Sequence, residues 1–370
     1  MAASAESALA LIKAEVRAAD GYTLAALTAP RKLNQNESPF DVPAAVKQAV
    51  LGRAAQIAWN RYPAFAPADL HERLAARHAW RADGVLVGNG SNELIQATLA
   101  VTVGAGTAVV TPVPTFTLYR LLATVYGGCH VAAPLDAAFA FDLDALVRAA
   151  RESRAAVVIV NTPNNPTGTP LPGGGVERLL EETESLVVVD EAYQDFGGPT
   201  AVPLLAAHPR LVVLRTFSKA MAMAGLRFGY LLAHPAVTRE VAKGKLPYNV
   251  NAITLAAAHA ALDHAGALEA MVAEVRRSRD RLVAGLSRVP GLETFPTAAN
   301  FVLIRCRAVP AADVFRRLVQ EHGILVRDVS AGPGLRECLR ITAGTDGDVD
   351  AVLAALRTIL GEGGMGKGER

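Results

Sequence analysis

Five groups of polar residues in this chain lie at or near the end of an apolar stretch. Open α/β sheets bind ligands at the carboxyl ends of their strands, so chemistry could take place at these positions. Residues 88–92, Gly-Asn-Gly-Ser-Asn, would let backbone N–H groups approach an anion such as a phosphate. Residues 161–168, with two prolines and adjacent asparagines, predict a stiff loop that holds side-chain amides in place. The alternative for both groups is a plain turn, with Ser91 as a helix N-cap in the first.

The third and fourth groups supply charges. Apolar residues 186–189 lead to Asp190 and Glu191, and a buried carboxylate is costly unless it is paired. A helix-capping role is the alternative for Asp190. Residues 211–214 lead to a run of hydroxyls and cations, which are Thr216, Ser218, Lys219 and Arg227. Because apolar residues lie on both sides of Lys219, we expect its amine to be enclosed.

The fifth group is a pair of arginines. Arg327 follows Ile-Leu-Val, and Arg340 lies within Cys-Leu-Arg-Ile-Thr. An arginine on a strand between apolar residues needs an anion opposite it, since its guanidinium cannot lose its charge. A structural salt bridge is the alternative for each.

Together, these groups comprise a phosphate cradle, a carboxylate, an enclosed lysine and two arginines. Few cofactors need that combination, and pyridoxal 5'-phosphate is one that does. A carboxylate keeps the pyridine nitrogen protonated, and a lysine binds the aldehyde covalently. The same lysine can move a proton at the substrate Cα once the substrate amine has displaced it.

The elements that must position these residues belong to an α/β fold. Short runs rich in Val and Ile alternate with amphipathic stretches, which predicts a mainly parallel sheet covered by helices on both faces. The expected strands are 85–88, 108–112, 130–134, 155–161, 186–190, 211–216 and 228–233. The expected helices between them are 93–103, 115–125, 143–150 and 175–182.

The pattern changes after residue 245. Helices are expected at 253–264, 268–286, 311–322 and 349–360, and strands at 300–305, 324–327 and 338–342. We therefore predict an N-terminal arm over 1–40, a large domain over 41–245 that binds the cofactor, and a small α+β domain over 246–370. Residues 361–370 show no apolar periodicity and are expected to fray.

Composition excludes several classes of protein. The 370 residues are 51% apolar and carry 37 Lys+Arg against 35 Asp+Glu, so a net charge of +2 predicts neither nucleic acid nor a membrane as partner. Cys129, Cys306 and Cys338 lie too far apart for a local metal site, so we expect no metal and buried free thiols. The first residues do not resemble a signal peptide, and we predict a cytoplasmic protein.

The motifs, in order, resemble those of the fold-type I aminotransferases, which share the aspartate aminotransferase-like fold. The resemblance rests on Gly90-Ser91-Asn92, Thr111-Pro112, Phe116, residues 164–168, residues 190–193, Ser218-Lys219, Arg227 and Arg340. Within that family the chain is most similar to the histidinol-phosphate aminotransferases, on residues 33–37, 61–63, 323–328 and 339–342.

The resemblance implies a role for each site residue. Lys219 would bind the pyridoxal phosphate and carry the proton, and Asp190 would pair with the ring nitrogen. Tyr193 and Asn165 would hydrogen-bond the ring hydroxyl, and Phe116 would stack on the ring. The cofactor phosphate would lie among Ser91, Asn92, Thr216, Ser218 and Arg227.

The substrate and the second subunit have implied positions too. Arg340 would bind the anionic group of the substrate, next to Asn165, and Arg327 would add the charge that a phosphate ester needs. Tyr62 would reach the cofactor phosphate of the other subunit, so a homodimer is expected. Tyr248 lies in a segment that could contact an imidazole ring.

The implied reaction is transamination between L-histidinol phosphate or imidazole acetol phosphate and glutamate or 2-oxoglutarate, in histidine biosynthesis. An aromatic amino acid aminotransferase is the nearest alternative, because specificity rests on a few pocket residues. A pyridoxal phosphate decarboxylase acting on a phosphorylated amino acid is another. A regulatory module without activity and an NAD-dependent dehydrogenase are disfavoured, the former by Lys219 and Asp190 and the latter by Glu93 in place of a third glycine.

Overall fold

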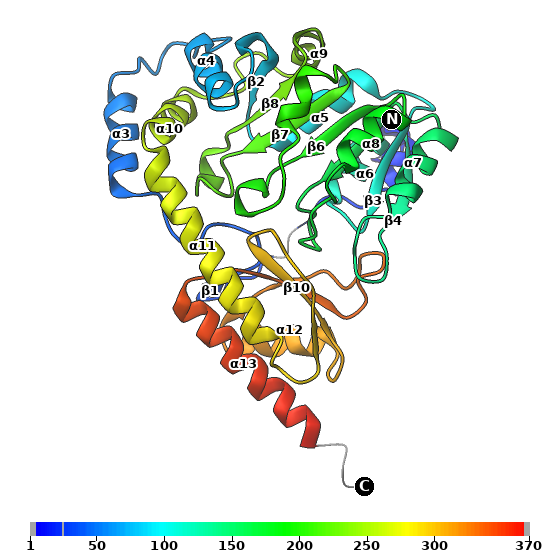
Figure 1. Ribbon diagram of the computed structural model, residues 1–370, viewed down its shortest axis with the longest axis vertical. Helices are drawn as coiled ribbons and strands as arrows, with labels where there is room; N and C mark the ends of the chain where they lie inside the picture. The colour runs from blue at the N-terminus through cyan, green and yellow to red at the C-terminus, as the bar shows by residue number, and fades with distance from the viewer. Residues whose placement is uncertain (1–4, 24–25, 366–370) are drawn as a thin grey trace.

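The computed structural model describes residues 5–23 and 26–365, with side chains to residue 361. Its larger sheet has seven strands in the order β2-β8-β7-β6-β5-β3-β4 (Figure 1). The strands are β2 (Val85–Gly88), β3 (Ala108–Val113), β4 (Cys129–Pro134), β5 (Val157–Asn161), β6 (Leu186–Asp190), β7 (Leu211–Thr216) and β8 (Gly229–Ala233). Only the pairings of β8 with β2 and β7 are antiparallel, so the sheet is mainly parallel, as predicted.

Helices cover both faces of this sheet because its strands are apolar on both sides. Val187 and Val189 belong to one buried cluster, and Val188 between them belongs to another. The first cluster is closed by α4 (Ala68–Arg77), α7 (Leu143–Glu152), α8 (Gly175–Glu182) and α10 (Ala252–Asp263). The second is closed by α5 (Ser91–Thr102), α6 (Leu118–Val125) and α9 (Pro235–Val241). The predicted fold class is confirmed.

A second, antiparallel sheet lies below the first in Figure 1, in the order β12-β13-β10-β9. Its strands are β9 (Leu292–Thr294), β10 (Phe301–Cys306), β12 (Arg327–Asp328) and β13 (Cys338–Thr342). The helices beside it are α11 (Ala265–Leu286), α12 (Ala311–Gln320) and α13 (Asp346–Met365). The long helix α11 runs from the level of the large sheet to the small one (Figure 1). The predicted domain boundaries at 40 and 245 stay a prediction.

The N-terminal part of the chain is tied to this lower layer. Strand β1 (Arg31–Lys32) pairs in parallel with β11 (Ile324–Leu325), and the backbone of Leu33 continues the pairing to Leu325. Helices α1 (Ala5–Leu9), α2 (Ala14–Ala18) and α3 (Ala44–Ala55) complete the order. Short 3-10 turns lie at Ala82–Gly84, Gln194–Phe196, Val202–Ala206, Ala224–Leu226 and Ala242–Gly244.

Three expectations from the sequence are wrong. The single strand expected at 324–327 is two strands, because Ile324 and Leu325 pair with the arm whereas Arg327 and Asp328 pair with β13. Cys129 is exposed, since it begins the edge strand β4, while the other two cysteines are buried. The last helix continues to Met365 through part of the predicted frayed tail. Residues 366–370 of that tail, and residues 1–4 and 24–25 of the arm, lie outside the described residues. Over the residues that the structure does describe, no helix has the length and apolar character needed to cross a membrane.

Candidate functional site

The predicted residues meet where the strands of the large sheet end. Asn161 pairs with Asp190 across β5 and β6, and Thr216 pairs with Gly229 across β7 and β8. Gly229 is required here, because a Cβ at this position would lie 2.4 Å from the backbone nitrogen of Ser91. The absence of that Cβ lets the N-terminus of α5 approach the end of β7 closely.

Asp190 is the buried carboxylate of the site. Its Oδ2 accepts a hydrogen bond from the hydroxyl of Tyr119 at 2.7 Å, and its Oδ1 accepts one from the backbone of Ala192 at 3.1 Å. Burial raises the pKa of this carboxyl, and the two hydrogen bonds and the charge of Lys219 oppose that rise. The group therefore has donors that stabilise its ionised form but no ion pair of its own among the described residues.

Lys219 supplies the amine. Its Nζ donates a hydrogen bond to the backbone oxygen of Gln35 at 2.9 Å and lies 5.8 Å from the ring centre of Tyr193. Removal of water from around the amine lowers its pKa to about 7, and the nearby charges of Arg340 and Arg227 lower it further than the charge of Glu37 raises it. A large fraction of the amine is thus neutral at physiological pH, which is the form that attacks an aldehyde.

The glycine-rich turn and Arg227 form an anion cradle. Gly90 is the N-cap of α5 and Ser91 is the first residue of the helix, so the alternative in which Ser91 caps the helix does not hold. A Cβ on Gly90 would lie 2.5 Å from Nη2 of Arg227, so the guanidinium rests directly against the turn. Arg227 donates to Ser218 Oγ and to the oxygen of Ala224, both at 3.1 Å.

The charge of Arg227 is not neutralised by the described part of the chain, where no carboxylate forms an ion pair with it. Its backbone has φ of 57°, a left-handed conformation that costs energy for a residue with a Cβ and that often marks functional sites. The hydroxyl of Thr216 accepts from the backbone of Ser218 at 3.1 Å, beside the same cation. Asn92 lies exposed in the first turn of α5, where backbone N–H groups are free to bind an anion.

Tyr193 has its hydroxyl oriented by the arm. Asn36, buried and with φ of 54°, donates from Nδ2 to the Tyr193 hydroxyl at 3.0 Å. Burial raises the pKa of Tyr193 to about 12, so the phenol stays protonated and its own proton remains available to an acceptor in the site.

Arg327 and Arg340 face each other across two strands. They are direct partners in the antiparallel register of β12 and β13, so their side chains leave the same face of the sheet. Arg340 is buried, donates to the oxygen of Asn34 at 2.7 Å, and contacts the side-chain oxygen of Asn165. Its Nε has no partner within residues 5–23 and 26–361, and burial together with the charge of Arg327 lowers the pKa of Arg340 to about 10. Two like charges on the same face of neighbouring strands favour an anion beside them.

Aromatic side chains surround these polar groups. Phe116 is half-buried and packs edge-to-face against Tyr119, with ring centres 5.5 Å apart, and against Tyr22 of the arm at 6.0 Å. Tyr22 itself is 58% exposed, and its ring contact with Phe116 brings the arm to this aromatic group.

Tyr62 stands apart from the other predicted residues. It is 81% exposed and stacks on Tyr248 with ring centres 4.5 Å apart, while Phe65 packs edge-on against Tyr248. Within a single chain, Tyr62 therefore faces outward rather than into the cluster around Lys219.

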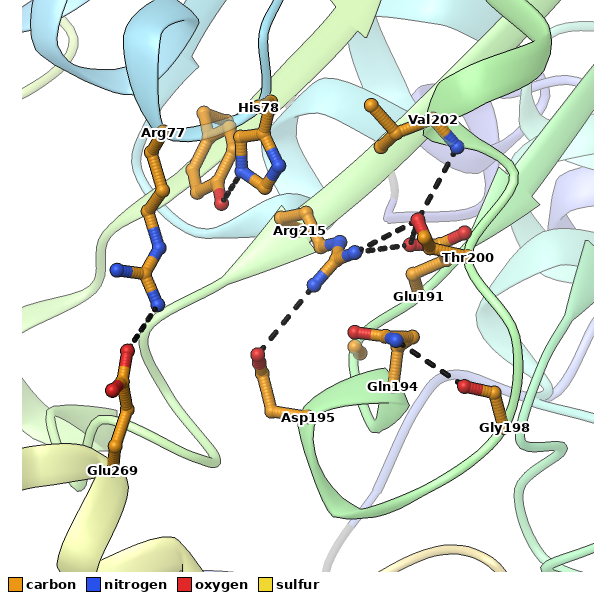
Figure 2. A network of polar contacts seen from close by, with 12 residues as sticks. Arg77, His78, Glu191, Gln194, Asp195, Gly198, Thr200, Val202, Arg215 and Glu269 are labelled. Carbon is orange, nitrogen blue, oxygen red and sulfur yellow. Dashed lines mark hydrogen bonds and ion pairs between the residues drawn. The ribbon is translucent and has the colours of Figure 1, made fainter.

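Alternation along the strands places sequence neighbours on opposite faces, both for the two acids Asp190 and Glu191 and for Arg215 and Thr216. Asp190 and Thr216 face the site, whereas Glu191 and Arg215 form a buried ion pair of 2.6 Å on the opposite face. Figure 2 shows this network, in which Arg215 also contacts Thr200 and Asp195, with the His78–Tyr230 and Arg77–Glu269 pairs nearby. The ion pair with Arg215 offsets the desolvation free energy of burying Glu191, and it holds that carboxylate outside the site.

Sequence reasoning missed three residues of this site, Tyr119, Asn36 and Tyr22. Tyr119 had a usable signal, because it lies one helical turn after Phe116 and so shares a face with it. Asn36 and Tyr22 belong to the arm, and only the folded chain brings the arm to the ends of the strands.

The cluster fits the needs of pyridoxal phosphate. It offers an amine for the aldehyde, a buried carboxylate for the ring nitrogen, and a cation without a counter-ion beside a helix N-terminus for the phosphate. The unpartnered Nε of Arg340 leaves a donor for a substrate anion. No group of three metal-binding side chains occurs among the residues with described positions.

Comparisons with known proteins agree with the geometry. The family model for aminotransferases of class I and II matches residues 30–356. Histidinol-phosphate aminotransferase 1 of Burkholderia lata is 40% identical over 356 residues, covering 95% of this chain and 98% of that protein. Histidinol-phosphate aminotransferase of Chlorobium phaeovibrioides is 38% identical over 332 residues, covering 89% of this chain and 91% of that protein.

Solved structures give the same result. The histidinol-phosphate aminotransferase of Sinorhizobium meliloti, in complex with pyridoxal 5'-phosphate, has a TM-score of 0.86 and 27% identity, and the match covers 97% of this chain and all of that one. The L-threonine-O-3-phosphate decarboxylase of Porphyromonas gingivalis has a TM-score of 0.78 at 23% identity, over 90% of this chain and 99% of that one, which shows the shared fold alone. The resemblance inferred from the motifs is confirmed: this chain belongs to the class I and II aminotransferase family.

Proposed function

We propose that the protein is a pyridoxal phosphate-dependent aminotransferase that transfers an amino group between L-histidinol phosphate and 2-oxoglutarate, in histidine biosynthesis. The observation that carries the substrate assignment is the facing pair of Arg327 and Arg340, two cations without a carboxylate partner among the described residues. One arginine suffices for the α-carboxylate of glutamate, whereas a phosphate dianion uses both. The names of the relatives that are 36–40% identical support the same substrate.

Each residue of the site then has a task. Pyridoxal phosphate, when bound, supplies a ring that accepts electron density from the substrate Cα. Lys219, as a neutral amine, would bind the aldehyde and, once released by the substrate amine, would move a proton between the substrate Cα and the former aldehyde carbon of the cofactor. Asp190 keeps the ring nitrogen protonated, and Tyr193 and Asn165 donate to the ring hydroxyl. Arg227, Ser218, Thr216 and the backbone of Ser91 and Asn92 hold the phosphate, and Phe116 stacks on the ring.

The active unit in this proposal is a homodimer. Tyr62, Phe65 and Tyr248 form an exposed aromatic cluster, and isolated chains rarely leave such a group in water. A second copy of the chain would cover the cluster and receive Tyr62 at its cofactor phosphate. We place the dimer in the cytoplasm, because the charged, phosphorylated substrates of the proposed reaction do not cross membranes unaided.

The test is a half-reaction with single substrates. The purified protein, loaded with pyridoxal phosphate, is mixed in turn with histidinol phosphate, glutamate and phenylalanine, and the absorption of the lysine-bound cofactor is followed. The proposal expects rapid conversion to the pyridoxamine form with the first two substrates and slow conversion with phenylalanine. Faster conversion with phenylalanine would identify an aromatic amino acid aminotransferase, and release of CO₂ from a phosphorylated amino acid would identify a decarboxylase.

A further inference from the structure

We propose that Tyr119 is a positioning residue for Asp190, whose hydroxyl fixes the orientation of that carboxylate and keeps it ionised for the cofactor ring nitrogen. This inference rests on the proposed function, and it concerns a residue that touches neither substrate nor the reacting atoms. Tyr119 lies in the first turn of α6, and Asp190 is the last residue of β6. The contact therefore joins a helix to the carboxyl end of a central strand.

The geometry of the contact is that of a strong hydrogen bond. The Tyr119 hydroxyl lies 2.7 Å from Oδ2 of Asp190, and its side chain has no exposed surface. No water competes with a contact this deeply buried, and hydrogen bonds to an ionised acceptor are about twice as strong as neutral ones. The backbone of Ala192 holds the other oxygen, so both oxygens of the carboxylate have a donor.

The Tyr119 hydroxyl has the largest effect among the groups that keep the Asp190 carboxylate ionised. Three titratable groups face Asp190: Tyr119 from α6, Tyr193 from the turn after β6, and Lys219 from the loop after β7. Burial raises the pKa of Asp190, and the hydrogen bond from Tyr119 is the largest of the effects that lower it. Burial and the charge of Asp190 raise the pKa of Tyr119, so the phenol remains a donor at every working pH.

Tyr119 also contacts the aromatic wall of the site. Its ring packs edge-to-face against Phe116, the residue proposed to stack on the cofactor. One side chain therefore supports both the group proposed for the ring nitrogen and the group proposed for the ring face. A tyrosine with a merely structural role would need only its ring, which a phenylalanine would supply equally well.

The experiment compares Tyr119→Phe with the wild type for binding of pyridoxamine phosphate. This probe has the ring and phosphate of the cofactor but no aldehyde, so bonding to Lys219 does not contribute. Binding is measured by equilibrium dialysis between pH 5 and pH 9, together with turnover. We expect binding to weaken as the pH falls, because burial raises the pKa of Asp190 and the protonated acid no longer stabilises the charged ring nitrogen. Without the Tyr119 donor, the midpoint of that loss should move upward by about one pH unit.

A matched control and a second variant keep the test decisive. Tyr230→Phe removes an equally buried hydroxyl, bonded to His78 at 2.7 Å, and should leave the midpoint unchanged. Tyr119 replaced by 3-fluorotyrosine keeps the fold and donates more strongly, so its midpoint should move downward. A midpoint that is the same in all four proteins would overturn the role of Tyr119. A wild type that binds no pyridoxamine phosphate at any pH would overturn the proposed function instead.

Discussion

At the scale of single residues, the site depends on shifts in protonation that burial produces. The Lys219 amine has its pKa lowered to about 7, and the Asp190 carboxyl has its pKa raised. Both shifts disfavour charge, which is the expected effect of removing water. The sequence predicted an enclosed lysine, because apolar residues flank it, but it did not predict that arm residues and two arginines would surround it.

The pH dependence of cofactor attachment tests this environment. The rate at which pyridoxal phosphate bonds covalently to the cofactor-free protein should rise between pH 6 and pH 8, with a midpoint near the pKa of about 7, and then level off. The sign follows from the lowered pKa, since only the neutral amine attacks and it predominates above pH 7. Attachment is trapped with borohydride and measured by mass spectrometry.

Lys219→Ala is the control for that measurement. It should fold, bind the cofactor without a covalent bond, and show no turnover. A rate in the wild type that keeps rising to pH 10 would mean that the amine is solvated like an ordinary lysine.

At the scale of elements, strand alternation decides which charges reach the site. Asp190 and Thr216 face the ligand side, and their neighbours Glu191 and Arg215 face the opposite side as an ion pair. The bounds of the parallel strands were predicted to within one or two residues. Strands that are buried on both faces are continuous runs of Val and Ile, and such runs are easily recognised in the sequence. Helices α3 and α4 were not predicted. Helix α3 is rich in alanine and gains its stability by packing on α10, a contact 200 residues distant along the chain.

The buried ion pair should matter for stability more than for chemistry. Glu191→Ala should lower the free energy of unfolding by about 3–5 kcal/mol, because it leaves Arg215 charged and buried without a partner. The double variant Glu191→Ala/Arg215→Met should recover part of that loss. The measurement is denaturant unfolding followed by circular dichroism.

An exposed pair provides the comparison. Arg178→Ala, which breaks the solvent-accessible ion pairs with Glu182 and Asp144, should cost less than about 1 kcal/mol. If Glu191→Ala lowers the free energy of unfolding by no more than Arg178→Ala does, then the buried ion pair does not stabilise the fold.

The register of β12 and β13 predicts a substrate-dependent effect of Arg327. Arg327→Ala should weaken transition-state binding of histidinol phosphate by ~2–5 kcal/mol, through the loss of a buried charge pairing, with a smaller effect on glutamate. The measurement is kcat/KM for each half-reaction. Arg316→Ala, an exposed arginine on α12, should change neither value. Equal losses for both substrates would exclude a phosphate-specific role for Arg327.

At the scale of the whole molecule, one chain does not bring every predicted residue together. Tyr62 faces solvent on the aromatic cluster, away from the residues around Lys219 that we propose bind the cofactor. The arm also acts at this scale, because Gln35 and Asn36 follow β1, which pairs with β11, and both contact residues of the site.

Complementation between two inactive variants tests the dimer. Tyr62→Ala and Lys219→Ala are each expected to be impaired, by weakened phosphate binding and by loss of the amine. If Tyr62 acts across the interface, a refolded equal mixture should recover about a quarter of wild-type activity, since half of the dimers have one intact site. A mixture no more active than its components would mean that Tyr62 serves its own chain or none. Tyr126→Phe mixed with Lys219→Ala serves as the matched control.

The sequence by itself determined the seven strands of the large sheet, most of the helices between them, and the residue types that stand at the strand ends. Those features depend on the local sequence, because an apolar run or a strand–turn–helix junction consists of consecutive residues. The tertiary structure alone decided that Tyr119 would donate to Asp190, that Arg327 would face Arg340, and that the arm would hold Lys219 and Tyr193. Each of those contacts joins segments far apart in the chain, and their geometry depends on register and packing that no local pattern specifies.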